Sequence, residues 1–481
     1  MVKIRYLKIG MLLECAVLAF LGIFYFSCGE ALYMRESDGC VAEFPATGEI
    51  GELTDGILAE QIFTSQMDRM DAVGVLVSNY GRAQNSSLLV RVEDAVDGRL
   101  IAQRAFPAGE LGIGQYVWLD TGGLHMPRGR LVRVICTSDG TAGNAPTVWY
   151  TVEDGLKNKA VARDAELFVN GKKLEGTMCI ALKGRDEVWT GPNYYKLVLA
   201  AVLSVAAVYA AAVWRRESGR RSWFFLLLDV LHKYGFLIQQ LVARDFKVRY
   251  KRSVLGVFWS FLNPLLMMVV QYLVFSQLFR SDIENYPVYL LCGLVVFNFF
   301  NEGVGQALSS IVGNAALITK VYLPKYIYPV TRVLSSGINL LMSLAPLLLA
   351  AFLTGEKMTA AYLMLPYILG CVMVFTTGLG MALAAGMTFF RDIQFLWGVL
   401  SMLWMYLTPL FYPVSIVPEA FRGAVLHNPM YIFVHAVRAI VLEGTAPRPL
   451  VFFQCTWIAL AMLAAGGMIF KKTQDRFIFY I

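Results

Sequence analysis

No segment of this sequence has the residue spacing that nucleotide hydrolysis requires. Phosphate-binding loops follow the pattern G-x-x-x-x-G-K-[ST], in which backbone amides surround the phosphates and the lysine contacts them. Gly171-Lys172-Lys173 comes nearest to this pattern, but no glycine precedes it at the required distance. We therefore expect the chain not to hydrolyse ATP and to leave that step to a separate subunit. We also expect it not to be an enzyme and to bind no cofactor or metal.

Aromatic side chains are the residues best suited to weak binding of sugar rings, because their faces pack against ring CH groups. An acidic block in the first half of the chain contains Tyr80, Tyr116, Trp118, Trp149, Tyr150 and Trp189. Apolar runs in the second half contain Phe258, Trp259, Phe261, Tyr272, Phe275, Phe297, Phe299, Phe300, Trp404 and Tyr406. Each of these rings also fits a place in a packed core or against lipid, and both interpretations stay open.

A basic stretch alternates cations with apolar and aromatic residues. It runs from Arg244 to Arg252 and includes Arg244, Asp245, Lys247, Arg249 and Tyr250. Such a segment can lie in a membrane interface, with its apolar side in lipid and its cations near phosphates. More than thirty residues pass here without a clean span, so we expect an amphipathic membrane-surface helix at 222–254.

The whole composition places these residues in a membrane protein. Of the 481 residues, 57% are hydrophobic and 16% are charged, against about 25% in soluble domains. The net charge is +7. Residues 29–192 hold 16 Lys and Arg and 23 Asp and Glu, a net charge of −7, and the remainder carries +14. The basic residues flank apolar runs, as at the cytoplasmic edges of membrane proteins, so we expect no nucleic-acid partner.

Eight apolar runs approach the roughly 20 residues needed to cross a bilayer. They are Ile9–Cys28, Tyr195–Trp214, Leu255–Phe279, Val288–Leu308, Val330–Leu353, Ala360–Phe390, Phe395–Phe411 and Leu450–Phe470. The first run is long for a signal peptide and no A-x-A site follows it, which favours an uncleaved anchor. With both termini in the cytoplasm, the Lys and Arg bias is satisfied at every turn.

The acidic block between the first two spans then lies outside the cytoplasm. Its short alternating runs are punctuated by Gly, Asn and Asp, which is typical of an antiparallel β-sandwich. Cys40, Cys136 and Cys179 lie in this block, where an oxidising exterior permits one disulfide among them. The sequence leaves the pairing open. The pattern loosely resembles jelly-roll, carbohydrate-binding-like modules.

From about residue 225 to 481 the chain resembles the ABC-2 type permeases that export polysaccharides, the O-antigen and teichoic-acid transporter family. The resemblance rests on an ordered set of motifs, of which any single one is weak. They are Arg244-Asp245-Phe246-Lys247, Trp259-Ser260-Phe261-Leu262-Asn263-Pro264, Leu323-Pro324-Lys325, Phe390-Arg391-Asp392, Thr408-Pro409-Leu410-Phe411-Tyr412-Pro413, Asn428-Pro429 and Leu442-Glu443-Gly444, with Arg438. The anchor, the β-domain and the second span are additions to this family pattern.

The resemblance implies roles for particular residues. An ATPase-coupling surface would comprise Gly313, Asn314, Leu317, Lys320, Tyr322, Leu323, Pro324, Lys325, Arg391 and Asp392. Short helices at the outer mouth, over Val414–Leu442, would form a gate that includes Pro413, Pro418, Asn428 and Pro429. Channel aromatics would be Phe258, Trp259, Phe261, Tyr272, Phe299 and Tyr406.

The predicted fold is an α-helical polytopic membrane protein with about eight transmembrane helices and an inserted extracytoplasmic antiparallel β-sandwich. Its predicted parts are the N-terminal end and first span at 1–28, the β-sandwich at 29–192, and the second span with its basic flank at 193–221. The surface helix at 222–254 and a six-helix permease core at 255–481 follow.

The predicted function is that of a permease subunit exporting a lipid-linked polysaccharide, O-antigen-like or teichoic-acid-like, across the cytoplasmic membrane of a bacterium. The expected partners are two copies of an ABC ATPase, a second copy of the chain, the polymer and membrane lipids. Two alternatives stay open: an ABC-2 exporter of a small molecule or lipid, and a membrane-anchored glycan-binding sensor or envelope-assembly protein.

Overall fold

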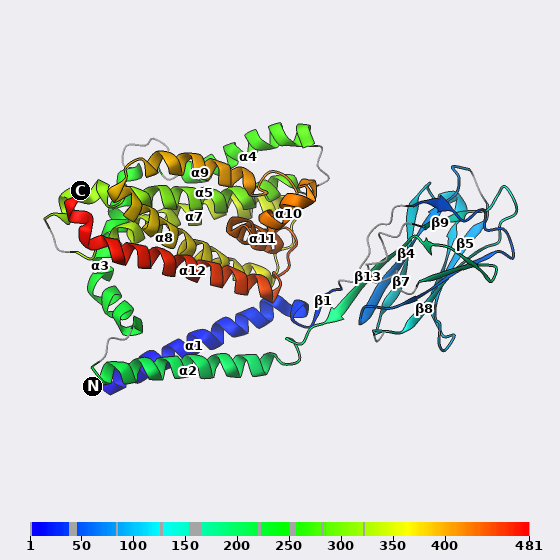
Figure 1. Cartoon of the computed structure of the whole chain (residues 1–481), viewed down its shortest axis with the longest axis horizontal. Coiled ribbons are helices and arrows are strands. Elements are labelled where there is room, and N and C mark those ends of the chain that lie inside the picture. Colours follow the sequence, from blue (N-terminus) through cyan, green and yellow to red (C-terminus); the bar gives the residue numbers. More distant parts are fainter. Residues whose placement is uncertain are drawn as a thin grey trace. The chain divides into compact units, whose positions relative to one another are not determined.

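The chain divides into two compact units, each drawn in Figure 1. The helical unit combines Met1–Gly29 with Tyr195–Ile481, and the β-unit is Glu30–Tyr194. The computed structural model describes residues 2–37, 46–82, 85–125, 128–152, 165–219, 223–250, 256, 258–279, 283, 285–320 and 323–480.

The β-unit consists of two antiparallel sheets. The strands are β1 (Met34–Glu36), β2 (Gly48–Glu49), β3 (Leu58–Thr64), β4 (Arg69–Ser78), β5 (Ser87–Asp94), β6 (Leu100–Pro107), β7 (Gln115–His125), β8 (Leu131–Ser138), β9 (Thr147–Thr151), β10 (Glu166–Val169), β11 (Lys172–Leu174), β12 (Thr177–Met178) and β13 (Ile180–Glu187). One sheet has the order β1-β13-β4-β9-β12, with β2 paired to β9 and β7 paired to β4. The other sheet has the order β11-β10-β3-β8-β5-β6. One-turn 3₁₀ helices η1 (Gly29–Leu32) and η2 (Ala108–Glu110) accompany them.

The two sheets enclose one hydrophobic core. Alternate residues of β3 are buried, as expected when one face of a strand packs inward. Val73 and Val75 of one sheet and Val90 and Val134 of the other are among the residues of the shared core. The alternating runs that predicted an antiparallel β-domain therefore correspond to real strands with one buried face.

Two cysteines of the β-unit, Cys136 and Cys179, belong to its hydrophobic core. Cys136 and Cys179 are free thiols and are buried in the shared core, so they do not form the disulfide that the sequence permits with each other. Cys40 lies outside the described residues. Burial raises the pKa of both the Cys136 and the Cys179 thiol to about 12, which keeps them protonated and unreactive.

The helical unit is built from long apolar helices with short connecting turns (Figure 1). The helices are α1 (Val2–Cys28), α2 (Tyr194–Glu217), α3 (Trp223–Tyr250), α4 (Phe258–Phe279), α5 (Tyr286–Leu308), α6 (Ala315–Ile318), α7 (Ile327–Leu353), α8 (Leu365–Phe389), α9 (Ile393–Leu407), α10 (Glu419–Leu426), α11 (Pro429–Val441) and α12 (Pro449–Thr473). The 3₁₀ turns are η4 (Val312–Asn314), η5 (Ala360–Met364), η6 (Val414–Ile416) and η7 (Gln474–Phe479).

Within the described residues, seven helices are long and apolar enough to cross a membrane, or up to eight if one bent pair counts as a span. The bent pair is α10 with α11, whose axes meet at 74°. The predicted span Phe395–Phe411 is shorter than expected, because α9 has only 15 residues and ends before Thr408-Pro409. Proline supplies no backbone N–H, so the helix stops ahead of it.

Glycine allows a very close contact between α8 and α12. A Cβ atom on Gly466 would lie 1.8 Å from the carbonyl oxygen of Gly378. Two helix backbones can approach this closely only where neither carries a side chain. Apolar side chains gain little from packing with each other in lipid, so such contacts of small residues help to hold membrane helices together.

The first N-terminal span, α1, packs against the beginning of α8 and against α12. Phe20 of α1 lies 5.0 Å from the Tyr367 ring of α8, and Phe24 lies 5.0 Å from Phe452 of α12, centroid to centroid. At the end of α1, the Ser27 hydroxyl donates to the carbonyl of Ala360 at 3.0 Å. The chain therefore leaves α1 beside the beginning of α8.

Candidate functional site

One end of the helical unit gathers the turn after α5, the end of α8 and the C-terminal segment. Ile311, Ile318, Phe470 and Phe477 are buried in one hydrophobic cluster there, together with residues of α8. Phe389, the last residue of α8, lies 5.9 Å from the Phe477 ring. Segments more than 150 residues apart in the sequence thus form one small surface at this end.

The predicted coupling residues lie at this end. Gly313 and Asn314 belong to η4 and Leu317 to α6, where the Asn314 amide donates to the Ser310 carbonyl at 2.7 Å. Lys320, Arg391 and Asp392 are exposed. Leu323 and Pro324 are half-buried, and Tyr322 lies outside the described residues.

Lys325 does not reach freely into solvent as its predicted role would suggest. Its ammonium group donates to the carbonyl of Gln474 at 2.6 Å and lies 5.7 Å from the Phe477 ring. The side chain joins the turn before α7 to the C-terminal η7. Lys325 therefore holds these two segments together at this end of the helical unit.

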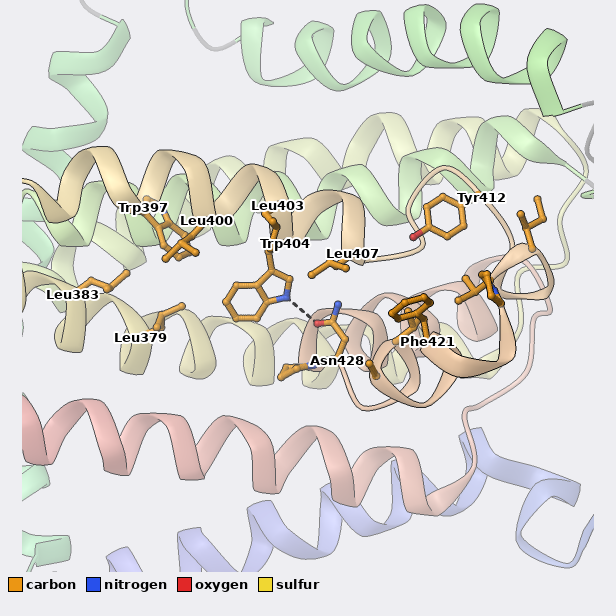
Figure 2. Close-up of a pocket in the computed structure, with 16 residues that line it drawn as sticks. Leu379, Leu383, Trp397, Leu400, Leu403, Trp404, Leu407, Tyr412, Phe421 and Asn428 are labelled. Atoms are coloured by element: carbon orange, nitrogen blue, oxygen red, sulfur yellow. Dashed lines mark hydrogen bonds between the residues drawn. The ribbon is translucent and has the colours of Figure 1, made fainter.

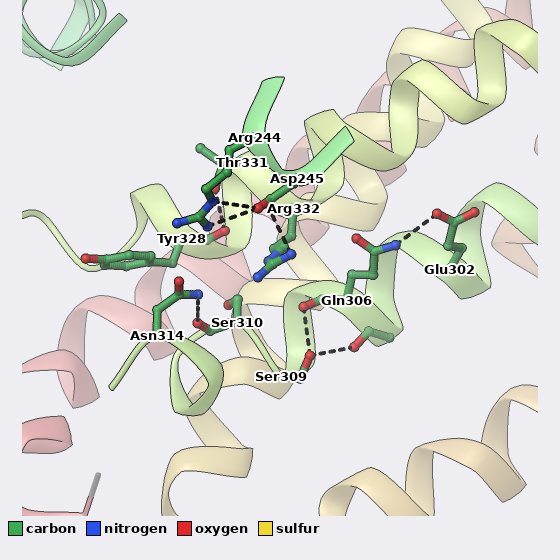
Figure 3. Close-up of polar contacts among 11 residues, drawn as sticks. Arg244, Asp245, Glu302, Gln306, Ser309, Ser310, Asn314, Tyr328, Thr331 and Arg332 are labelled. Atoms are coloured by element: carbon green, nitrogen blue, oxygen red, sulfur yellow. Dashed lines mark hydrogen bonds and ion pairs between the residues drawn. The ribbon is translucent and has the colours of Figure 1, made fainter. Parts of the chain in front are cut away.

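Helix α3 is held to α7 by an ion pair, drawn in Figure 3. An Asp245 carboxylate oxygen lies 3.1 Å from the Arg332 guanidinium, and the other oxygen accepts from Arg244 at 3.0 Å. The Asp245 side chain is only 8% exposed. Arg244 and Lys247 are exposed on the same helix. Arg249 and Tyr250 are the last two residues of α3.

The opposite end of the unit contains a loop whose carbonyls are held one after another. The carbonyls of Pro409 and Leu410 accept from the Arg438 guanidinium at 2.7 and 2.8 Å. Phe411 accepts from the Tyr286 hydroxyl at 2.6 Å, and Tyr412 accepts from the Tyr289 hydroxyl at 2.9 Å. Four consecutive backbone groups of the loop after α9 are thereby fixed by side chains of α5 and α11.

Arg438 is the centre of this arrangement. Its side chain comes from α11, and the residue is only 6% exposed. The guanidinium carbon lies 3.4 Å from the centroid of the Tyr289 ring, a cation–π contact. Sequence reasoning noted Arg438 as part of a motif but assigned it no role, because nothing in the spacing shows that α5 supplies its partners.

The predicted gate residues begin the short helices. Pro413 precedes η6, Pro418 precedes α10, and Asn428 and Pro429 begin α11. The Asn428 amide has three partners: its oxygen accepts from the Met430 N–H at 3.1 Å and from the Trp404 indole at 2.8 Å, and its nitrogen donates to Thr408 at 2.9 Å. The Asn-Pro pair therefore caps α11 and ties it to α9.

An apolar cavity of about 780 Å³ lies between α8, α9, α10 and the start of α11, as Figure 2 shows. Leu379 and Leu383 come from α8, and Trp397 and Leu400 come from α9. Phe421 lines it on the side of α10. The Trp404–Asn428 hydrogen bond lies in its wall.

A second cavity, of about 340 Å³, lies between α4, α5 and α7 and is polar. Two of the predicted channel aromatics, Trp259 and Phe299, line it. Trp259 is 45% exposed, whereas Phe299 is buried. The structure thus brings one exposed and one buried ring to the same cavity.

The other predicted channel aromatics lie apart from this cavity. Phe258 stacks on Phe261 at 5.5 Å, Tyr272 lies 6.1 Å from Tyr286, and Tyr406 lies on α9. Phe258, Tyr272 and Tyr406 are at least 40% exposed. Which exposed faces meet a passing polymer stays a prediction.

The aromatics of the β-unit have mixed surroundings. Tyr116, Trp149 and Tyr150 pack against the core. The Trp118 ring lies over Gly74, where a Cβ atom would come within 3.0 Å of it, and the Lys183 ammonium lies 4.1 Å from the ring centroid. Among the described residues, no three His, Cys, Asp or Glu side chains are grouped so as to hold a metal ion.

Comparisons with known proteins agree on the helical half of the chain. Residues 236–442 match the family described as ABC-2 type transporter. The O-antigen export system permease protein RfbA of Myxococcus xanthus is 32% identical over 253 residues, which cover 52% of this chain and 97% of the relative. The protein of the same name from Klebsiella pneumoniae is 29% identical over 254 residues, 52% of this chain and 98% of the relative.

A more distant relative is the polysialic acid transport protein KpsM of Escherichia coli. It is 20% identical over 245 residues, which cover 50% of this chain and 93% of the relative. Nearly the whole of each relative is therefore matched by about half of this chain. The chain belongs to the ABC-2 type transporter family.

Proposed function

We propose that this chain is the permease subunit of an ABC transporter that exports a lipid-linked polysaccharide. The observation that carries the proposal is the match of half the chain to nearly complete export permeases. A hydrated polymer cannot cross lipid alone, because its hydroxyls would lose their water partners. Helical walls with polar and aromatic surfaces offer it a path.

The energy for export comes from a separate ATPase, since the chain has no phosphate-binding loop of its own. We assign its docking surface to the coupling end, which η4, α6, the turn after α8 and the C-terminal segment build together. Exposed Lys320 and Arg391 supply cations there. Helix α3 moves with this end through the Asp245–Arg332 ion pair.

The coupling end belongs in the cytoplasm and the gate end outside. The 25 residues of α8 make a helix about 37 Å long, enough to cross a bilayer. Its last residue packs at the coupling end, and its beginning lies beside the Ser27 end of α1. The hydroxyl of Tyr362 in η5 donates to the carbonyl of Val441, the last residue of α11. This arrangement supports a topology in which α1 leads from the cytoplasm to a β-unit outside it. Both termini of the chain then lie in the cytoplasm.

The working unit that we propose is two permease copies and two ATPases in the cytoplasmic membrane of a bacterium. Each ATPase would act on one coupling end, and the polymer would pass along α4, α5 and α9. The gate helices α10 and α11 close the outer side, held by Arg438 and Asn428.

Purification of the full chain from its own cells in mild detergent tests the proposal. We expect an ATPase to co-purify and the pair to drive ATP-dependent polysaccharide uptake into inside-out vesicles. The double variant Lys320→Glu/Arg391→Glu should lose the ATPase. The matched control is Lys357→Glu, an exposed cation in the turn after α7, at the gate end.

If no ATPase accompanies the wild-type chain, the transporter proposal is wrong and the sensor alternative gains support. If the double variant retains the ATPase as well as the Lys357→Glu control does, the assignment of the docking surface is wrong.

A further inference from the structure

The polar cavity between α4, α5 and α7 contains amides that have no partner in the described protein. Asn263 lies on α4 and Asn298 on α5, and both are exposed residues of membrane-crossing helices. No side-chain hydrogen bond joins either amide to another residue in the part of the chain that the structure describes. An amide that faced hydrocarbon without a partner would cost several kcal/mol, roughly 4–8 on a cyclohexane scale. Such groups therefore face water, a ligand or another protein chain.

One carboxylate, that of Glu302, also lines this cavity. Glu302 accepts hydrogen bonds at Oε1 from the Asn339 amide at 2.8 Å and the Gln306 amide at 2.9 Å. Figure 3 shows Glu302 and Gln306 one turn apart on α5. Because it accepts two N–H groups, Glu302 Oε1 acts as a hydrogen-bond acceptor. No Lys, Arg or His is among the described residues that line the cavity.

The cavity also offers an aromatic face beside these groups. Trp259 lines it and is 45% exposed, and Ser343 donates to the Ser260 carbonyl at 3.2 Å, which joins α7 to α4 along its wall. Amides that donate and accept, with an indole that packs against ring CH groups, match the surface of a sugar. The volume of about 340 Å³ is at the lower end of the range for small-ligand sites.

We infer that this cavity binds uncharged, hydroxyl-rich sugar residues of the exported polymer and disfavours residues that carry phosphate or carboxylate. The inference rests on the proposed function and narrows its substrate class. A sugar hydroxyl can both donate to and accept from Asn263 and Asn298. An anionic group would be repelled by the Glu302 carboxylate, and the described residues that line the cavity include no Lys, Arg or His to offset the repulsion.

Saturation-transfer NMR on the full-length chain in lipid nanodiscs tests this inference, because it detects weak sugar binding. The probes are maltohexaose, which is neutral, and a galacturonate hexamer, which is anionic. We expect the wild-type chain to bind maltohexaose and to bind the galacturonate hexamer much more weakly. The variant Asn263→Ala/Asn298→Ala should weaken maltohexaose binding roughly tenfold, from the loss of two hydrogen bonds.

Two further variants complete the experiment. Asn301→Ala removes an exposed amide of α5 that does not line the cavity, and it should bind maltohexaose as the wild type does. Glu302→Gln is isosteric and should increase binding of the galacturonate hexamer several-fold. It keeps the inference testable if the double variant fails to fold.

Three results would each overturn the inference: equal binding of the two hexamers by the wild type, no binding of maltohexaose, or full binding by the double variant. None of them depends on the ATPase. Failure of ATP-driven export would overturn the proposed function instead, so the two failures can be told apart.

Discussion

Arg438 is the residue on which the loop after α9 depends most. Its guanidinium donates to Pro409, Leu410 and Tyr289 carbonyls while it lies against the Tyr289 ring. A buried cation must find such partners, because leaving it unpaired in a low-dielectric interior is costly. The loop carbonyls have the same need, since they belong to no helix. Both requirements are met by one side chain.

Replacement of Arg438 by Met should therefore destabilise the helical unit by about 3 kcal/mol, because several buried carbonyls lose their donor together. The measurement is the unfolding of the purified chain in detergent, followed by circular dichroism. Arg448→Met is the matched control, since Arg448 is exposed and precedes α12. Equal melting temperatures for the two variants would show that the guanidinium does not hold the loop.

The thiols of Cys136 and Cys179 give a second prediction at this scale. Burial raises the pKa of each to about 12, whereas an unfolded cysteine has a pKa near 8.5. As the pH rises, the thiols of the unfolded chain therefore lose their protons before those of the folded chain. The contribution of these thiols to the stability of the folded β-unit is fully present below about pH 8.5, and it is lost as the pH rises toward 12. At pH 8, iodoacetamide should leave both cysteines of the native chain unlabelled.

Mass spectrometry of the labelled peptides checks this prediction. The same chain unfolded in urea is the positive control and should be labelled at both positions. Labelling of the native chain at the unfolded rate would mean that the β-unit opens easily or that its core differs from the one described.

At the scale of elements, the pairing of α8 with α12 rests on the absence of side chains. Gly378 and Gly466 let the two backbones touch, and a Cβ atom on either residue would overlap the other helix. In the proposed mechanism this pairing is important, because α8 begins beside the proposed gate helices and ends at the proposed coupling end. A helix that connects both ends can carry a movement only if its neighbour holds it.

Gly466→Ala should force α8 and α12 apart and destabilise the unit by at least about 1–3 kcal/mol, as overpacking does. Gly467→Ala is the control on the next residue, where a Cβ atom would meet nothing within 4 Å. It should be neutral or stabilising by up to about 1 kcal/mol, because alanine favours a helix over glycine. Thermal unfolding in detergent separates the two variants, and similar curves would contradict the close approach.

At the scale of the whole molecule, the β-unit is an insertion whose two ends meet. Met34 of β1 pairs with Glu187 of β13, and the Val188 N–H donates to the Tyr33 carbonyl at 2.7 Å. The chain therefore enters and leaves the β-unit at neighbouring points. An insertion of this kind can be removed without stretching the segments that remain.

Replacement of residues 34–187 by a short Gly-Ser linker should leave the helical unit folded and still associated with its ATPase. We propose that the β-unit contacts the emerging polymer, so export should slow or the polymer length should change. Export in vesicles and gel analysis of the polymer measure this outcome. Unchanged export and unchanged length would exclude a role of the β-unit in contacting the sugar.

The sequence alone determined the class of protein, most of its membrane helices and the antiparallel character of the β-unit. These follow from local patterns: apolar runs near 20 residues, alternation with period two, and cations at the ends of spans. The family resemblance from about residue 225 onward added the expectation of an export permease. All of these depend on residues that are neighbours in the sequence.

Only the tertiary structure decided which distant residues act together. Arg438 has partners on α5 and in the loop after α9, and Glu302 has partners on α5 itself and on α7. It also showed that α9 is short, that Lys325 is tied to the C-terminal segment, and that Cys136 and Cys179 are free. No local pattern encodes these contacts, because they arise when helices and strands far apart in the sequence pack against one another.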